Sequence, residues 1–201
     1  MNAPYDFRIG LDLGGTKTEI AALAPDGRLL HRQRTPTPAS YDASLRGMAA
    51  MVQDIEQKMA GRASIGIGIP GVISPVTGLV KNANTIALNG HPFDRDLVAL
   101  LGRDIRVEND ANCFALSEAS DGAGAGAPVV FGVILGTGCG GGIVVHGQVL
   151  RGRNHITGEW GHTPLPWPTD DALPGPLCWC GHHNCLETLI AGPALPRACD
   201  R

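Results

Sequence analysis

A strand–glycine turn–strand pattern occurs twice in this chain and limits the folds that it can adopt. Apolar residues flank Gly14-Gly15-Thr16 between Arg8 and Leu23, and they flank Gly136-Thr137-Gly138 between Val129 and Val145. A short glycine-rich turn between two apolar runs predicts a β-hairpin. One hairpin in each half of the 201-residue chain favours a duplicated fold of two lobes. Two unrelated glycine-rich turns would give the same pattern.

Both turns have the composition of an anion site. Glycine has no Cβ, so backbone N–H groups can approach a phosphate closely, and Thr16 adds a hydroxyl donor. Asp12, at the end of the first expected strand, could hold a metal ion beside the phosphates. The turn at Gly14–Thr16 matches neither G-x-x-x-x-G-K-[ST] nor G-x-G-x-x-G, so it is not a Walker loop. Taken alone, the glycines favour a plain turn.

Three cysteines and a histidine lie within one short stretch, at His162, Cys178, Cys180 and Cys185. Cys-x-Cys lets two thiolates reach one ion from a tight turn, and a Cys₃His set suits tetrahedral zinc. Four protein ligands would make the site structural rather than catalytic. Spacing alone does not choose the histidine, since His155, His182 and His183 also compete. The alternative is a set of ordinary buried cysteines.

Asp110 follows a short expected strand at 105–107 and begins an expected helix. A carboxylate at a helix N-terminus is favoured by the macrodipole and by free N–H groups. Spacing alone therefore favours a capping aspartate. The functional alternative is a general base that accepts a proton from an attacking hydroxyl, with Asn109 holding a neighbouring hydroxyl.

Taken together and in order, these motifs resemble the ROK family (repressors, open reading frames and sugar kinases). The resemblance runs from Arg8 to about Gly192 and rests on Asp12-Leu-Gly-Gly-Thr-Lys17, Gly68-Ile-Pro-Gly71, Glu108-Asn-Asp-Ala-Asn112, Gly136-Thr-Gly-Cys-Gly-Gly141, Gly158-Glu-Trp-Gly-His162 and the cysteine group ending in Glu187. Three segments look most like bacterial fructokinases of the mannokinase type: 81–84, 88–94 and 159–167. Two others, 109–119 and 156–159, also look like N-acetylglucosamine kinase.

The resemblance implies a role for each matching residue. Asp110 corresponds to the catalytic base. The sugar would be bound by Gly71, Asn84, Asn109, Asp110, Glu159, His162 and Glu187. The nucleotide would be bound by Asp12, Gly14, Gly15, Thr16, Lys17, Gly136, Thr137 and Gly138. His162 would complete a structural zinc site with Cys178, Cys180 and Cys185, which fixes the loops of Glu159 and Glu187. The family usually has glycine at position 184, and asparagine there should keep the turn because it tolerates left-handed backbone conformations.

The resemblance also implies an α/β, actin-like ATPase (ribonuclease H-like) fold of two lobes, with the second lobe truncated. We expect an N-terminal lobe at 1–120 and the start of a C-terminal lobe at 121–201, joined by a flexible run at 121–127. Strands are expected at 8–13, 17–24, 28–35 and 64–69, and helices at 41–60 and 94–101. The helix at 41–60 carries an apolar core stripe at Leu45, Met48, Val52, Ile55 and Met59.

Composition excludes several classes of partner. A net charge of −3 provides no basic face for nucleic acid or anionic membrane, and there is no membrane-length apolar run or signal peptide. Clustered thiols at metal spacing favour a reducing, cytoplasmic location. The resemblance implies a homodimer.

The expected function is an ATP- and Mg²⁺-dependent hexose kinase that phosphorylates the 6-hydroxyl of fructose, with mannose or glucose as secondary substrates. The alternatives are an N-acetylglucosamine kinase or a sugar-binding sensor without turnover. Family members continue past residue 201 with segments that build the adenine pocket, so we expect this chain to bind ATP poorly without them. The sequence does not decide between a fragment and a truncated protein.

Overall fold

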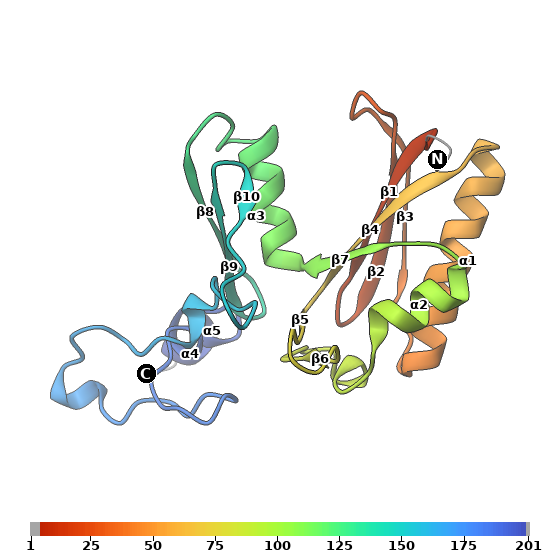
Figure 1. Ribbon diagram of the computed structural model, residues 1–201. Coiled ribbons are helices and arrows are strands. Elements are labelled where there is room, and N and C mark those ends of the chain that lie inside the picture. Colours follow the sequence, from red (N-terminus) through yellow and green to blue (C-terminus); the bar gives the residue numbers. More distant parts are fainter. Residues whose placement is uncertain (1–4, 200–201) are drawn as a thin grey trace. The chain divides into compact units, whose positions relative to one another are not determined.

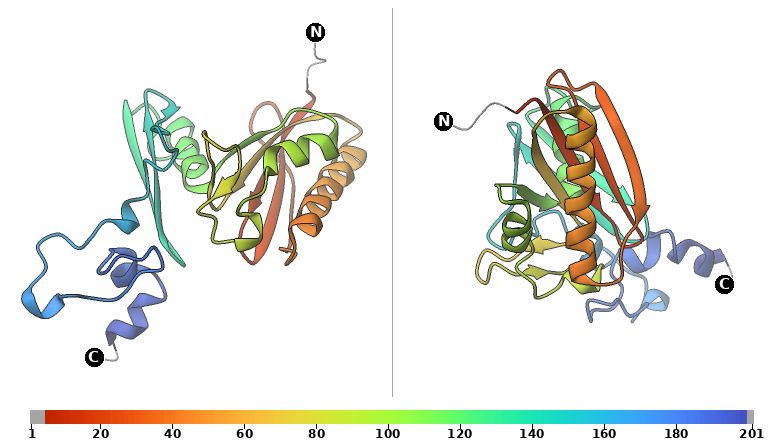
Figure 2. Two further views of the ribbon diagram at one scale, coloured as in Figure 1. Left: turned by 60° about the horizontal axis from the view of Figure 1, so that its bottom comes forward. Right: turned by 90° about the vertical axis from the view of Figure 1, so that its right-hand side faces the viewer.

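The structure is a computed structural model that describes residues 5–199 (Figures 1 and 2). The chain forms two compact units, of which the first ends at Asp110 and the second begins at Ala111. The strands and helices expected from the sequence are present, with ends within two residues of the expected ones. Each unit is described by itself below.

The first unit contains a five-stranded sheet with the strand order β3-β2-β1-β4-β7. β1 pairs antiparallel with β2, and β2 with β3, whereas β1–β4 and β4–β7 are parallel pairs. Parallel neighbours need crossover connections, which α1 and α2 provide. The elements in chain order are β1 (Phe7–Leu13), β2 (Lys17–Leu23), β3 (Leu29–Pro36), α1 (Tyr41–Met59), β4 (Ala63–Ile69), β5 (Val72–Ile73), β6 (Val80–Lys81), the 3₁₀ helix η1 (Ile86–Leu88), α2 (Phe93–Leu101) and β7 (Arg106–Asn109).

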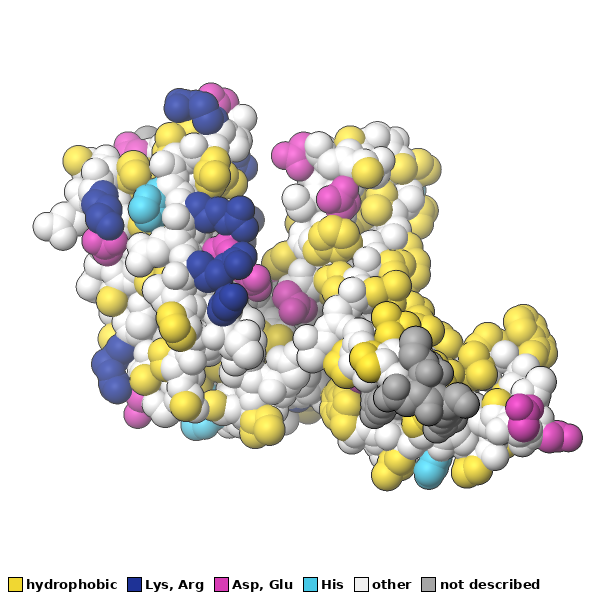
Figure 3. Space-filling model, turned by 180° about the vertical axis from the view of Figure 1, so that it is seen from behind, with side chains coloured by type: hydrophobic (Ala, Val, Ile, Leu, Met, Phe, Trp, Pro, Cys, Tyr) yellow, Lys and Arg dark blue, Asp and Glu magenta, His cyan; other side chains and the backbone are white. Residues whose placement is uncertain are grey.

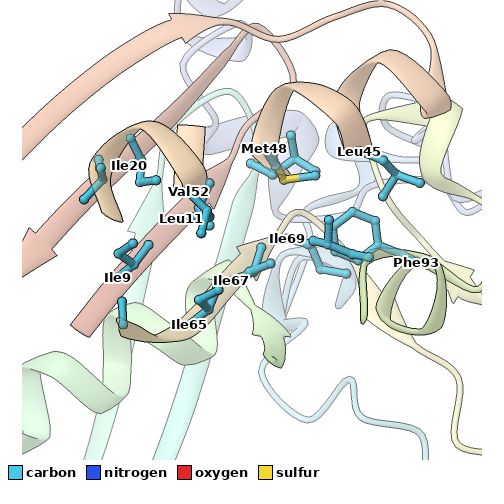
Figure 4. Close-up of a cluster of buried hydrophobic side chains, with 14 of the residues drawn as sticks. Ile9, Leu11, Ile20, Leu45, Met48, Val52, Ile65, Ile67, Ile69 and Phe93 are labelled. Carbon is cyan, nitrogen blue, oxygen red and sulfur yellow. The ribbon is translucent and has the colours of Figure 1, made fainter. Parts of the chain in front are cut away.

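The core of this unit lies between α1, α2 and one face of the sheet (Figure 4). Alternate residues of β1 point into it, because successive side chains of a strand face opposite sides. The expected stripe on α1 is confirmed: Leu45, Met48, Val52 and Ile55 are buried, and Met59 packs against the core while partly exposed. Together these helices hold the sheet whose strand ends carry the candidate site residues.

The opposite face of the sheet is polar, and basic side chains gather on it (Figure 3). Its centre is Glu19 on β2, which forms ion pairs with Arg32 and Arg34 of β3. The hydrogen bond from Arg32, followed by that from Arg34, holds the pKa of Glu19 below its usual value. These cross-strand pairs fix the side chains beside the β1–β2 hairpin.

The second unit is built on a three-stranded antiparallel sheet with the order β10-β9-β8. Its β8–β9 hairpin has the full register from Val129↔Val145 to Leu135↔Cys139, as the sequence predicted. The elements are α3 (Asp110–Ser120), β8 (Val129–Leu135), β9 (Cys139–Val145), β10 (Gln148–Val149), the 3₁₀ helices η2 (Trp160–His162) and η3 (Asp170–Ala172), α4 (Glu187–Ile190) and α5 (Ala194–Cys199).

Glycines in the strands let α3 lie directly on this sheet. A Cβ on Gly132 would come within 2.9 Å of the Ala115 Cβ, and one on Gly142 within 2.6 Å of the Ala111 carbonyl oxygen. Ala111 and Ala115 are themselves buried. Small residues on both sides therefore set the close packing that places the start of α3, and with it Asp110.

The run at 121–127, expected to be a flexible connection between the lobes, instead forms a hydrogen-bonded turn between α3 and β8 inside the second unit. It is closed by hydrogen bonds from Gly124 N to Glu118 O, at 2.9 Å, and from Ala127 N to Gly124 O, at 3.1 Å. The two units divide after Asp110, whereas a division after residue 120 was expected. Apart from its first residue, α3 therefore belongs to the second unit. Within the described part of the chain, each helix is too short or too polar to span a bilayer.

Candidate active site and metal group

The turn that joins β1 to β2, Gly14–Thr16, will be called the first turn. Gly14 N donates to Lys17 O at 3.0 Å, and a Cβ on Gly14 would lie only 2.8 Å from that same oxygen. Thr37 fixes the turn from outside: its backbone N donates to Thr16 O at 3.0 Å, and its hydroxyl donates to Gly14 O at 2.8 Å. Thr37 was not predicted from the sequence.

Asp12 lies on the polar face of the sheet, one residue before the end of β1. It shares one cross-strand row with Glu19 and Gly68, and Gly68 is followed in that row by Glu108. Partial burial, and then the charge of Glu19, raise the pKa of Asp12, while Arg34 opposes them. A carboxylate whose charge is disfavoured in this way would gain from a hard divalent cation, which prefers oxygen ligands. The residue therefore fits the Mg²⁺ role expected of it.

The loop expected to contact the sugar lies beside the first turn in the same unit. A Cβ on Gly15 would be 3.9 Å from the Asn84 Oδ1, so these two predicted site residues are neighbours. Asn84 N donates to Pro70 O at 3.2 Å. Asn89, which sequence reasoning missed, accepts from Ala83 N at 2.9 Å and donates to Ala83 O at 2.8 Å. It thus pairs with the backbone of the loop as a strand would.

Gly71 and Asn109 are joined directly. The buried Asn109 donates from Nδ2 to Gly71 O at 3.2 Å, which connects the end of β7 to the segment after β4. Asp110 follows Asn109 as the first residue of α3 and is half-buried. The first unit thus unites the first turn, the 81–84 loop and the Asn109–Asp110 pair, as predicted from separate motifs.

The turn that joins β8 to β9, Gly136–Gly138, will be called the second turn. Its ends are closed by Gly136 N, which donates to Gly138 O at 2.9 Å. Cys139 N, directly after it, donates to Glu187 Oε2 at 2.9 Å. Burial, and then the Glu187 carboxylate, raise the pKa of the Cys139 thiol. Glu187, predicted as a sugar ligand, therefore also contacts the predicted phosphate turn.

The segment that carries Glu159 and His162 packs tightly on the start of β9. Trp160 Nε1 donates to Gly140 O at 2.7 Å. A Cβ on Gly161 would lie 2.2 Å from the Cys139 carbonyl oxygen, which leaves room for glycine alone. The motif Gly-Glu-Trp-Gly-His is therefore constrained by backbone packing on both sides of Trp160, and this packing places Glu159 and His162 within the second unit.

The structure brings the four predicted zinc ligands together. They will be called the metal group: His162, Cys178, Cys180 and Cys185. Their ligand atoms all lie within 4.8 Å of one another. Cys180 Sγ is 3.6 Å from Cys185 Sγ, and His162 Nδ1 is 3.5 Å from Cys178 Sγ. Tetrahedral zinc with its usual bond lengths requires about 3.8 Å between two sulfurs and about 3.6 Å between sulfur and nitrogen. The donor set therefore fits zinc in both chemistry and spacing.

The structure also selects the histidine that spacing had left open. Among the described residues, His162 joins the cysteines, while His183 Nδ1 is 3.0 Å from the Gly175 carbonyl oxygen. Burial and the neighbouring thiols raise the pKa of Cys185 to about 12, whereas the backbone N–H of His182 lowers that of Cys180. Asn184 has a φ of 61°, so asparagine keeps the left-handed turn, as expected.

Comparison with known proteins gives a consistent picture. A model of the ROK family matches residues 8–201. The N-acetyl-D-glucosamine kinase of Yersinia enterocolitica is 43% identical over 188 residues, which cover 91% of this chain and 62% of that protein. The enzyme of the same description from Shigella boydii is 44% identical over the same shares. This chain thus spans about 62% of the length of these curated relatives.

Solved structures of ROK proteins match this chain as a mixed α/β fold. The ROK hexokinase of Thermus thermophilus has a TM-score of 0.77 and 35% identity, over 96% of this chain and 63% of that one. The ROK family glucokinase of Streptomyces griseus, in complex with glucose and AMPPNP, has a TM-score of 0.79 and 32% identity, over 95% and 59%. The actin-like ATPase fold expected from the sequence is confirmed. The curated relatives are N-acetyl-D-glucosamine kinases, so the nearer likeness to fructokinases is not supported.

Proposed function

Because this chain belongs to the ROK family, we propose that it acts as a sugar kinase that transfers the γ-phosphoryl group of ATP to a sugar hydroxyl. N-acetylglucosamine is the first candidate substrate, since relatives at 43% and 44% identity have that specificity in their names. Fructose, favoured by the loop motifs, is the second. The chain covers 62% of those relatives, and the proposal concerns the activity of the protein to which these residues belong.

One observation supports the proposal: the first unit contains the first turn, the loop of Asn84 and the Asn109–Asp110 pair, joined by the contacts that follow. The first turn adjoins Asn84, and Asn109 is hydrogen-bonded to Gly71 at 3.2 Å beside Asp110. Phosphoryl transfer depends mainly on positioning the donor and the attacking hydroxyl and on stabilising charge. A rigid arrangement of a glycine turn, two amide side chains and a carboxylate supports that requirement.

The residues then have distinct roles. Asp110 accepts the proton of the attacking hydroxyl, and Asn84 and Asn109 bind neighbouring hydroxyls. In the second unit, Glu159, His162 and Glu187 are the proposed sugar ligands. The two glycine turns bind the phosphates through backbone N–H groups, with Thr16, Lys17 and Thr137 as side-chain donors. Mg²⁺ held near Asp12 would neutralise charge on the phosphates when it is bound. Zinc in the metal group would have a structural role only.

The test is a coupled phosphotransfer assay on the protein to which these residues belong, with ATP and Mg²⁺, against N-acetylglucosamine, fructose, mannose and glucose. We expect turnover with the first sugar and a lower kcat/KM for the others. Fructose as the best substrate would reverse the order of the two candidates. Sugar binding by calorimetry without any turnover would indicate a sugar-binding sensor and refute the kinase proposal. The Asp110→Asn variant controls for contaminating kinases.

A further inference from the structure

The Glu187 carboxylate connects two segments that are far apart in sequence. As the first residue of α4, it accepts from Cys139 N through Oε2 at 2.9 Å and from Trp179 Nε1 through Oε1 at 2.7 Å. One donor belongs to the end of the second turn, and the other belongs to the cysteine loop. Hydrogen bonds to a charged acceptor are about twice as strong as neutral ones. The carboxylate is therefore a strong link between the two.

Trp179 is placed by the metal group itself. It lies between the two ligands Cys178 and Cys180, and its ring meets the His162 ring edge-on, with centroids 4.8 Å apart and an interplanar angle of 89°. The side chain is 70% exposed, so burial does little to hold it. Its position therefore follows from Cys178 and Cys180 on either side of it in the sequence and from its contact with the His162 ring.

The second turn is fitted closely to Glu187. A Cβ on Gly138 would lie 2.6 Å from Glu187 Oε2, so the carboxylate rests against the turn. Two residues after the end of α4, Gly192 N donates to Gly136 O at 2.8 Å. Glu187 and the segment after α4 thus contact both ends of the turn, and a change in the position of Glu187 would be transmitted to the backbone N–H groups there.

We propose that Glu187 is a positioning residue that couples the metal group, through Trp179, to the second turn. Binding of the metal fixes the cysteine loop and Trp179, Trp179 fixes the carboxylate, and the carboxylate fixes the turn. Each carboxylate oxygen accepts one of these two hydrogen bonds and has a second lone pair that could accept from a sugar hydroxyl. The significance of the turn for phosphate rests on the proposed function, whereas the coupling itself does not.

Hydrogen exchange measured by mass spectrometry tests the coupling without nucleotide or sugar. In the zinc-loaded protein, the Trp179→Phe variant keeps an aromatic ring but removes the indole donor. Glu187→Gln keeps the side-chain volume but removes the charge. We expect both variants to raise exchange in the segment 136–140 about tenfold, as expected for loss of a charge-assisted bond, with zinc content by elemental analysis unchanged. Trp167→Phe is the matched control, since Trp167 is 93% exposed.

The order of the coupling is tested by combining the variants. Once Glu187→Gln is present, Trp179→Phe should add little to the exchange of 136–140, because its effect passes through the carboxylate. Removal of zinc with a chelator should raise exchange there in the unaltered protein. If chelation unfolds the second unit, exchange across β8 rises as well, and the zinc-loaded Trp179→Phe protein alone decides. Unchanged exchange in that variant overturns the proposal, whatever the kinase assay gives.

Discussion

The substitution Gly71→Ala tests whether backbone packing sets the sugar-binding loop. A Cβ at this position would lie 2.8 Å from the Lys81 carbonyl oxygen and 2.9 Å from both the Cα and the Cβ of Ala83. Ordinary contact begins near 3.4 Å, so the 81–84 loop must move by about 0.6 Å. The obstructing atoms are backbone atoms and a Cβ, and no flexible side chain can swing away.

The magnitude follows from this geometry. Overpacking of this kind costs about 1–3 kcal/mol, and about 2–4 °C of Tm per kcal/mol is typical for a chain of this length. Because Asn84 moves with the loop, and because Asn109 is bound to Gly71 O, KM for the sugar should also rise. A displacement near 1 Å can cost about 100-fold in rate, so about tenfold in kcat/KM is expected here.

Gly66→Ala is the matched control, on the neighbouring β4. An added Cβ there meets nothing within 4 Å, so the variant should be as stable as the parent or slightly more stable. Thermal unfolding and sugar kinetics on both variants complete the design. Equal Tm and kcat/KM in the two proteins would show that the loop yields freely, and the packing argument would be wrong.

Three further changes have defined outcomes. Cys180→Ser should abolish stoichiometric zinc in elemental analysis and lower Tm, since structural zinc contributes folding free energy; full zinc retention would contradict the metal group. Asp110→Asn should lower kcat by about 100-fold or more with sugar affinity retained, and a parallel loss of affinity in calorimetry would point to a binding role instead. Glu19→Gln should destabilise the protein by less than about 1 kcal/mol at pH 7, because its partners are exposed. The pKa of Glu19 is lowered from 4.5, so the ion pairs are lost as the pH falls below that value. The difference in unfolding free energy between the variant and the parent, measured in urea, should then disappear. A difference that persists in acid would exclude the ion pairs as its cause.

Periodic features of the chain were predictable from sequence. The stripe on α1 follows from helical spacing, and both hairpins follow from apolar runs around glycine turns. β5 and β6 have two residues each, too few to produce a period. Thr37 and Asn89 escaped prediction for another reason. Each acts by bonding its side chain to the backbone of a segment elsewhere, and such a contact leaves no pattern in the local sequence.

The metal group could be predicted from the sequence only in part. Cysteine spacing predicted the ligands because Cys-x-Cys in a turn has few other uses, and the structure brings all three thiols together. The histidine could not be chosen by spacing, since four candidates lie nearby. His162 is selected by the packing of its own segment, where Gly161 lies against Cys139 and Trp160 bonds to Gly140. That selection depends on β9, which is distant in sequence from the cysteines.

The two glycine turns look alike in sequence but are held by different means. The first turn is fixed by Thr37, a neutral side chain on the segment that follows β3, which is itself paired along its length with β2. The second turn is fixed by a carboxylate whose other partner belongs to the cysteine loop. The first turn is therefore held by contacts near the core of its own unit, whereas the proposed coupling would make the second turn depend on whether the metal group is closed. The two hairpins thus have similar turns whose backbones are held by different contacts.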